Sequence, residues 1–124
     1  MSGHDLKQED LAHFYGSQQW FRHWAVRSVL YTEGAQHVFE HGGAYWLLDE
    51  IAFRQMDRKA VKNEPFQVWD LKVVNSSGML TCENGNGNVV YTKKLDYTDF
   101  PLPSIRFFVE YDGQNRTIML PGER

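Results

Sequence analysis

Hydrophobic residues in the first half of the chain follow the spacing of helices. Apolar side chains recur three, four and seven residues apart through residues 44–58, which predicts an amphipathic helix with one face in the core. Before it, Thr32 precedes a second segment of this period, and its hydroxyl is suited to cap the first turn of a helix. That helix is expected to end at Gly42 and Gly43, because glycine tolerates the backbone conformation that terminates helices.

The N-terminal part of the chain is less regular. Asp5 is a candidate cap for a short helix over residues 6–15. Rings and aliphatic residues follow without a period from Trp20 to Val26. The next run, residues 26–31, is assigned to a short strand, although the tail of a helix starting at Ser17 would also fit it.

Beyond residue 65 the period changes from that of helices to that of strands, with apolar residues at alternate positions. Glycines and asparagines between residues 84 and 88 indicate a hairpin loop. The expected strands are residues 68–74, 79–83, 89–97, 105–111 and 117–120. Helices followed by strands with short connections are typical of an α+β fold. We therefore predict one α+β domain over residues 1–124, with N-terminal helices packed on a four- to five-stranded antiparallel β-meander.

Composition narrows the class of protein. The 124 residues carry 13 basic and 16 acidic side chains, and the formal net charge of −3 argues against a nucleic-acid partner. Cys82 is the single cysteine, so the chain cannot form an internal disulfide or a cysteine-built zinc site. The longest stretch with few charges is far shorter than the ~20 apolar residues that span a bilayer. We expect a cytoplasmic protein without membrane contact.

One motif suggests metal chemistry. His37, Glu40 and His41 match the H-x-x-E-H pattern of the inverzincin metallopeptidases, in which two histidines bind zinc and the glutamate acts as base. The spacing fits, because side chains four residues apart lie on one helical face. Two observations oppose it: glycines end the helix directly after His41, and no later helix offers a third ligand. We therefore expect no cofactor, with zinc bound by His37 and His41 as the alternative.

Aromatic residues point to binding. Rings make up 15% of the chain, a large share for a core of this size, and tryptophan and tyrosine at a surface form the energetic centres of protein interfaces. Asp49 lies between Trp46 and Phe53 on the long helix. A carboxylate among rings is either a structural hydrogen-bond partner or part of a binding site. The candidate binding residues are Trp20, Trp24, Tyr45, Trp46, Asp49 and Phe53.

Several segments carry a resemblance to a known family. They are residues 31–34, 42–49 (GGAYWLLD), 66–69, 86–91 and 97–102. Together they make the chain similar to an uncharacterised family of small bacterial, plasmid and phage proteins, a domain of unknown function. The resemblance covers nearly the whole chain and implies a single-domain protein that is often found on mobile elements. It implies no reaction, cofactor or catalytic residue.

These observations lead to three hypotheses of function. The first is a non-enzymatic binding protein, phage- or plasmid-encoded, that occupies a surface of a host protein. Inhibition of a bacterial defence system is the most concrete version of this hypothesis. It is suggested by the occurrence of the family on mobile elements. The second is a small zinc-dependent hydrolase that uses the motif at residues 37–41. The third is a protein that sequesters a small ligand, such as a nucleotide, between helix and sheet.

Overall fold

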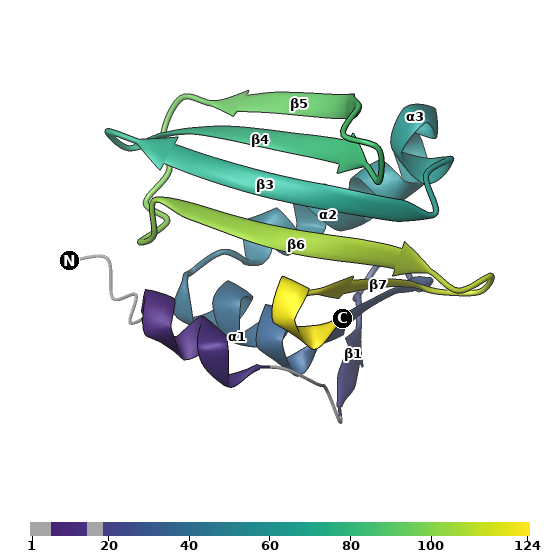
Figure 1. The fold of residues 1–124 in the computed structure, drawn as a ribbon, viewed down its shortest axis with the longest axis horizontal. Helices are drawn as coiled ribbons and strands as arrows, with labels where there is room; N and C mark the ends of the chain where they lie inside the picture. The colour runs from purple at the N-terminus through teal and green to yellow at the C-terminus, as the bar shows by residue number, and fades with distance from the viewer. Residues whose placement is uncertain (1–5, 15–18) are drawn as a thin grey trace.

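A computed structural model describes residues 6–14 and 19–124, which form a curved sheet with the two longest helices on one face (Figure 1). The described strands are β1 (Trp20–Arg22), β2 (Val29–Thr32), β3 (Phe66–Val74), β4 (Ser77–Asn84), β5 (Val89–Leu95), β6 (Ser104–Tyr111) and β7 (Arg116–Met119). The helices are α1 (Glu33–His41), α2 (Tyr45–Asp57) and α3 (Lys59–Lys62), with the 3₁₀ helices η1 (Gln8–His13) and η2 (Pro121–Glu123). Within these residues, no helix is long and apolar enough to cross a membrane.

The fold is α+β, but its sheet differs from the predicted one. Seven strands, counted over the described residues, pair in the order β1-β2-β7-β6-β3-β4-β5. Strand β2 runs parallel to β7, whereas every other neighbouring pair is antiparallel. The predicted four- to five-stranded antiparallel meander is therefore wrong. Strand β2 overlaps the strand predicted at residues 26–31, but it pairs with β7 from the far end of the chain, and the three-residue β1 is too short for alternation to reveal it.

The two predicted central helices form as expected. The backbone N–H of Ala35 donates to Thr32 Oγ1 over 3.2 Å, so Thr32 is the N-cap of α1. The helix ends before Gly43, whose φ of 60° places it in the left-handed region. Helix α2 begins at Tyr45, directly after this turn. The first predicted helix is shorter than expected and is the 3₁₀ helix η1, while its proposed cap, Asp5, lies outside the described residues.

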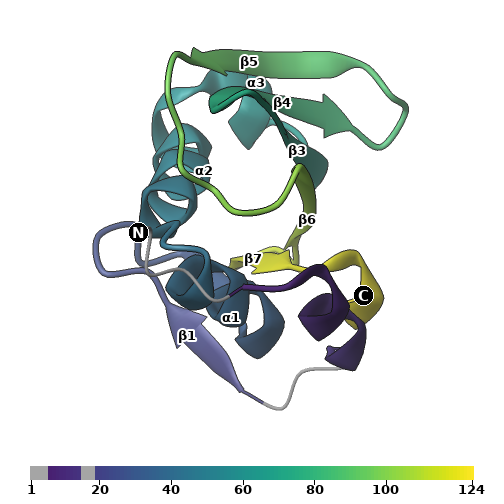
Figure 2. The same ribbon diagram turned by 90° about the vertical axis from the view of Figure 1, so that its left-hand side faces the viewer.

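The core lies between the helices and the concave face of the sheet. Figure 2 shows α1 and α2 on this side, with α2 extending from the level of α1 towards α3 and β5. Alternate residues of β3, β4 and β6 point inward, as predicted for β3 and β6. Phe39 of α1 stacks on Phe107 of β6 with ring centroids 5.2 Å apart. The largest fully buried side chains include Trp69, Phe39, Phe107, Leu47, Ile51, Leu71 and Leu80.

A buried pair of glutamines joins the helices to the sheet. Gln55 of α2 and Gln67 of β3 exchange reciprocal amide hydrogen bonds of 2.7 and 2.8 Å. The Gln67 amide also donates to the carbonyls of Val61 and Glu64, and its oxygen accepts the Trp69 indole N–H at 2.9 Å. Both glutamines are at most 3% exposed, so these bonds satisfy groups that water does not reach.

Hydrogen bonds join η2, near the C-terminus, to the start of α1. The Glu123 carboxylate of η2 accepts hydrogen bonds from the Thr32 hydroxyl at 2.6 Å and from the backbone N–H of Gly34 at 3.0 Å. It also accepts the N–H of Leu120 at 2.8 Å. A negative side chain at a helix N-terminus is favourable, because the first N–H groups and the helix dipole are positive there. A residue remote in sequence thus completes the cap of α1.

Candidate functional site

The candidate site lies where the loop between β1 and β2 meets α2. Tyr45, Asp49 and Phe53 are four residues apart on this helix, so they form one stripe along it. The loop residue Trp24 packs on this stripe, with its indole ring 6.1 Å from the Phe53 ring in an edge-to-face arrangement. We call the set Trp24, Tyr45, Asp49 and Phe53 the α2 patch. The structure thus brings together four of the six predicted binding residues.

His23 binds the central residue of this arrangement, Asp49, from the protein interior. Its ring is fully buried, and its Nδ1 accepts the backbone N–H groups of Ala25 and Val26 at 3.0 and 2.9 Å. An Nδ1 that accepts two hydrogen bonds carries no proton, so the ring proton is on Nε2. Nε2 lies 2.7 Å from Asp49 Oδ1 and therefore donates to it. Geometry thus defines a neutral His23 that orients the Asp49 carboxylate.

Asp49 and Trp24 form the exposed part of the site. The Trp24 indole N–H donates to the same Asp49 Oδ1 at 3.1 Å, so this oxygen receives two donors. The Asp49 side chain is 39% exposed, and the Trp24 residue is 70% exposed. Large rings with this exposure are normally free to change rotamer, but here a hydrogen bond and the edge contact with Phe53 hold the indole. The patch therefore presents an ordered ring beside a carboxylate.

Further rings extend the surface towards β1 and α1. Tyr31 stacks on Phe21 with centroids 5.5 Å apart. Partial burial, and then the negative charge of Asp49, raise the pKa of the Tyr31 hydroxyl. Partial burial and the Glu40 carboxylate likewise raise the pKa of Tyr45, whose hydroxyl donates to Glu40 at 3.4 Å. The negative charge of Asp49 thus reaches the neighbouring ring of Tyr31.

The remaining two predicted residues lie elsewhere. Trp46 is on the side of α2 that faces β5, where it lines a hollow of about 230 Å³. Trp20, on edge strand β1, is 54% exposed and lines a hollow between β1, β7 and the chain's end. The residues that share this second hollow include Glu110, Thr117, Met119, Glu123 and Arg124. Alternation along β6 puts Glu110 on the face opposite the helices, so Trp20 and the α2 patch lie on different faces of the sheet.

His23 is the central residue that the sequence did not reveal. Its role depends on the loop turning back, because its acceptor Nδ1 meets N–H groups two and three residues later in the chain. The signal available in the sequence was its position next to Trp24 in a segment without period. That signal could have indicated a structured loop, but it could not have identified Asp49 as the partner.

The opposite edge of α2 is fixed to the sheet by an ion-pair network. Glu50 accepts the Tyr91 hydroxyl at 2.6 Å and the Lys93 ammonium at 3.0 Å, both from β5. Arg54 lies 3.5 Å from the same carboxylate. Burial alone would raise the pKa of Glu50, but the hydrogen bonds from Tyr91 and Lys93, together with the charges of Arg54 and Lys93, outweigh it and lower that pKa. These contacts hold α2 in place, so the patch rests on a rigid helix.

The residues of the predicted zinc motif make contacts with neighbouring side chains. The rings of His37 and His41 are in contact, with centroids 4.3 Å apart and planes tilted by 33°, and His37 Nε2 lies 3.5 Å from a carboxylate oxygen of Asp10 in η1. Glu40 accepts the hydroxyl of Tyr45 at the start of α2. Across residues 6–14 and 19–124, no group of three histidine, cysteine or acidic side chains is placed to hold a metal ion. The motif thus contributes to packing between η1, α1 and α2.

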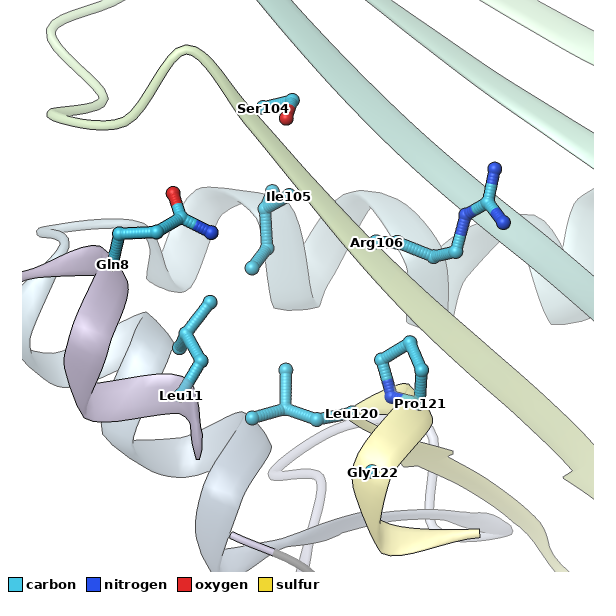
Figure 3. Close-up of a pocket in the computed structure, with 8 residues that line it drawn as sticks. All are labelled: Gln8, Leu11, Ser104, Ile105, Arg106, Leu120, Pro121 and Gly122. Atoms are coloured by element: carbon cyan, nitrogen blue, oxygen red, sulfur yellow. The ribbon is translucent and has the colours of Figure 1, made fainter. Parts of the chain in front are cut away.

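A third hollow of about 260 Å³ lies between η1, β6 and η2 (Figure 3). Its lining residues are Gln8, Leu11, Ser104, Ile105, Arg106, Leu120, Pro121 and Gly122. Arg106 is the charged member, and both its Nε and one terminal nitrogen bind the Asp70 carboxylate, at 2.8 and 3.0 Å. The hydrogen bond with Asp70 raises the pKa of Arg106 and keeps its charge balanced. None of the predicted binding residues lines this hollow, which is smaller than most ligand sites.

Cys82 provides a test of the buried sheet face. It is fully buried in β4 opposite Trp69, and burial, with the charges of Glu64 and Glu83, raises the pKa of its thiol to about 12. We expect the thiol of the native protein at about pH 8 to react with Ellman's reagent at least ~100-fold more slowly than that of the unfolded chain, because thiolate is the reacting form. Stopped-flow absorbance with and without guanidinium chloride measures this ratio. Equal rates would contradict the buried position.

Comparison with known proteins gives the family. The model of a family of unknown function, DUF6876, matches residues 5–124. The chain belongs to this family. The resemblance to an uncharacterised domain family is thereby confirmed. A search of curated proteins gives no match.

One solved structure shows the fold of this DUF6876 chain in a second protein. It is described as the crystal structure of the protein of unknown function from Enterococcus faecalis, and it is 23% identical to this chain with a TM-score of 0.58. The match covers 81% of this chain and 92% of that chain. At this identity the likeness concerns the fold alone and carries no activity or ligand to the α2 patch.

Proposed function

We propose that this DUF6876 protein is a non-enzymatic binding module that docks on a partner protein through the α2 patch. The observation that supports this is the 70% exposed indole of Trp24, held by the Asp49 carboxylate and the Phe53 ring. Ordering a side chain on binding costs free energy, and a ring that is already ordered avoids that cost. Rigid exposed tryptophans with polar neighbours are typical anchors of protein interfaces.

The chemistry of the patch favours binding over catalysis. His23, the histidine that binds Asp49 beneath the patch, is fully buried, and hydrogen bonds occupy both of its ring nitrogens. A general base must exchange a proton with a substrate, and this imidazole has no free nitrogen to do so. The Ser-His-Asp arrangement of hydrolases buries the carboxylate and exposes the histidine, whereas here the carboxylate is the exposed member. Asp49 is therefore positioned to receive a partner.

The sequence resemblance suggests which kind of protein the partner is. The bacterial, plasmid and phage proteins that the chain resembles suggest a host protein, and a component of a bacterial defence system is the specific candidate. This candidate stays a prediction. The α2 patch, in contrast, can be tested whichever host protein binds, because the test compares two tryptophans of one chain.

The test is affinity capture with matched tryptophan variants. Tagged wild-type protein, Trp24→Ala and Trp20→Ala are used to capture proteins from a lysate of the cells that encode the chain. We expect a stoichiometric partner with the wild type, at least ~10-fold less of it with Trp24→Ala, and no change with Trp20→Ala. Trp20 is the control because it is similarly exposed but lies on the other face of the sheet. Equal recovery with Trp24→Ala, or no partner at all, would refute the proposal.

A further inference from the structure

The Asp49 carboxylate carries a charge that its own surroundings do not balance. Its two hydrogen-bond donors, the imidazole of His23 and the indole of Trp24, are both neutral. No lysine or arginine of residues 6–14 and 19–124 forms an ion pair with it. The site therefore combines a full negative charge with aromatic surfaces, which weaken the screening by water around it.

The two arginines that flank His23 and Trp24 in sequence, Arg22 and Arg27, are engaged elsewhere. One guanidinium nitrogen of Arg27 donates to the backbone carbonyl of His23 at 2.9 Å. Arg22 donates to the carbonyl of Arg27 and to the side chain of Asn115. These bonds organise the loop between β1 and β2, but they leave the carboxylate of Asp49 without a cationic partner from this loop. A cation from another molecule would supply the missing charge.

One carboxylate oxygen is available to such a cation. Oδ1 already accepts from two donors, which is the usual capacity of one carboxylate oxygen. For Oδ2, no hydrogen bond is recorded with the part of the chain that the structure describes. The Trp24 indole lies beside it, with most of its surface in water. The two neighbouring acceptors are therefore an oxygen that can take an N–H group and a ring face that attracts positive charge.

We propose that the α2 patch receives an arginine side chain of the partner protein, with the guanidinium against the Trp24 indole and an N–H group on Asp49 Oδ2. This inference rests on the proposed function, since it names the partner group that the same patch takes. A guanidinium suits the site better than an ammonium, because its flat, weakly hydrated face stacks on a ring while its edge donates to a carboxylate. A lysine ammonium would balance the charge, but it would contact only one of the two groups, the ring face or the carboxylate oxygen.

The experiment uses a charged peptide and its neutral analogue. The peptides acetyl-Gly-Arg-Gly-amide and acetyl-Gly-citrulline-Gly-amide have nearly the same shape, but citrulline is uncharged. Two-dimensional NMR follows the indole N–H resonance of Trp24 in the full chain, assigned by its loss in Trp24→Phe. We expect a saturable shift with a millimolar Kd for the arginine peptide and at least ~5-fold weaker binding of the citrulline peptide. Equal affinities, or no saturable shift with arginine, would overturn the inference.

The variant Asp49→Asn isolates the charge. An asparagine oxygen can still accept from His23 and Trp24, so the loop keeps its hydrogen bonds while the negative charge is lost. We expect at least ~5-fold weaker binding of the arginine peptide to this variant, and unchanged affinity would overturn the inference.

The experiments also distinguish failure of the arginine inference from failure of the proposed function. If Trp24→Ala loses the captured protein but Asp49→Asn retains it fully, the proposed function stands and the arginine inference fails. If the arginine peptide binds as expected but capture yields no partner, the proposed function fails, although the α2 patch is still shown to bind a guanidinium group.

Discussion

Replacing Gln67 by leucine is expected to lower the free energy of unfolding by about 4 kcal/mol. The substitution keeps the volume of the side chain but removes its amide. The buried amide of Gln55, the indole N–H of Trp69 and the carbonyls of Val61 and Glu64 then each lose a partner. A buried polar group without a partner costs about 1–3 kcal/mol, and water reaches these groups poorly. Urea denaturation followed by circular dichroism measures the loss.

Two further variants test whether the glutamine pair causes that loss. Gln114→Leu makes the same chemical change at an exposed turn, and we expect it to alter stability by less than about 0.5 kcal/mol. The double variant Gln55→Leu/Gln67→Leu removes both members of the reciprocal pair. It should cost about 1–2 kcal/mol less than the sum of the single variants, because the two share their hydrogen bonds. Additive losses would show that the pair is not coupled.

The parts of the fold that local pattern determines could be predicted from the sequence. Helix α2 is long enough to show its period, and Thr32 and Gly43 mark the ends of α1 by backbone chemistry. Strands β3, β4 and β6 have eight or nine residues and alternate between buried and more exposed positions. In contrast, β1 is too short for a period. Strand β2 overlaps the strand predicted at residues 26–31, but its parallel pairing with β7 depends on contacts between distant parts of the chain.

The site was predictable to a similar extent. Tyr45, Asp49 and Phe53 form a stripe by helical spacing alone, so their proximity followed from the sequence. The contact of Trp24 with Asp49 required the path of the loop, and the buried His23 that orients the carboxylate could not be inferred without that path. Trp20 was grouped with these residues because strand β1 was not recognised, and the face of a side chain is undefined until its strand is known.

The second large effect concerns Glu123, which caps α1 from the far end of the chain. Glu123→Ala is expected to lower the free energy of unfolding by about 3 kcal/mol, because hydrogen bonds to a charged acceptor are worth about 1.5–3 kcal/mol each and are only partly replaced by water. The buried hydroxyl of Thr32 and the N–H groups of Gly34 and Leu120 lose their acceptor. Thermal and urea unfolding of the variant measure the loss.

Gly34→Ala gives a sharper test, because its effect should change sign with the residue at position 123. A Cβ at Gly34 would lie 2.6 Å from the Glu123 carboxyl carbon, so the carboxylate must move and its hydrogen bonds weaken. In the wild type we expect Gly34→Ala to destabilise the protein by about 2 kcal/mol. In the Glu123→Ala background the space is empty, and alanine should stabilise α1 by about 0.5 kcal/mol through its higher helix propensity. An equal loss in both backgrounds would mean that the close approach of Gly34 to Glu123 does not determine the stability of this cap.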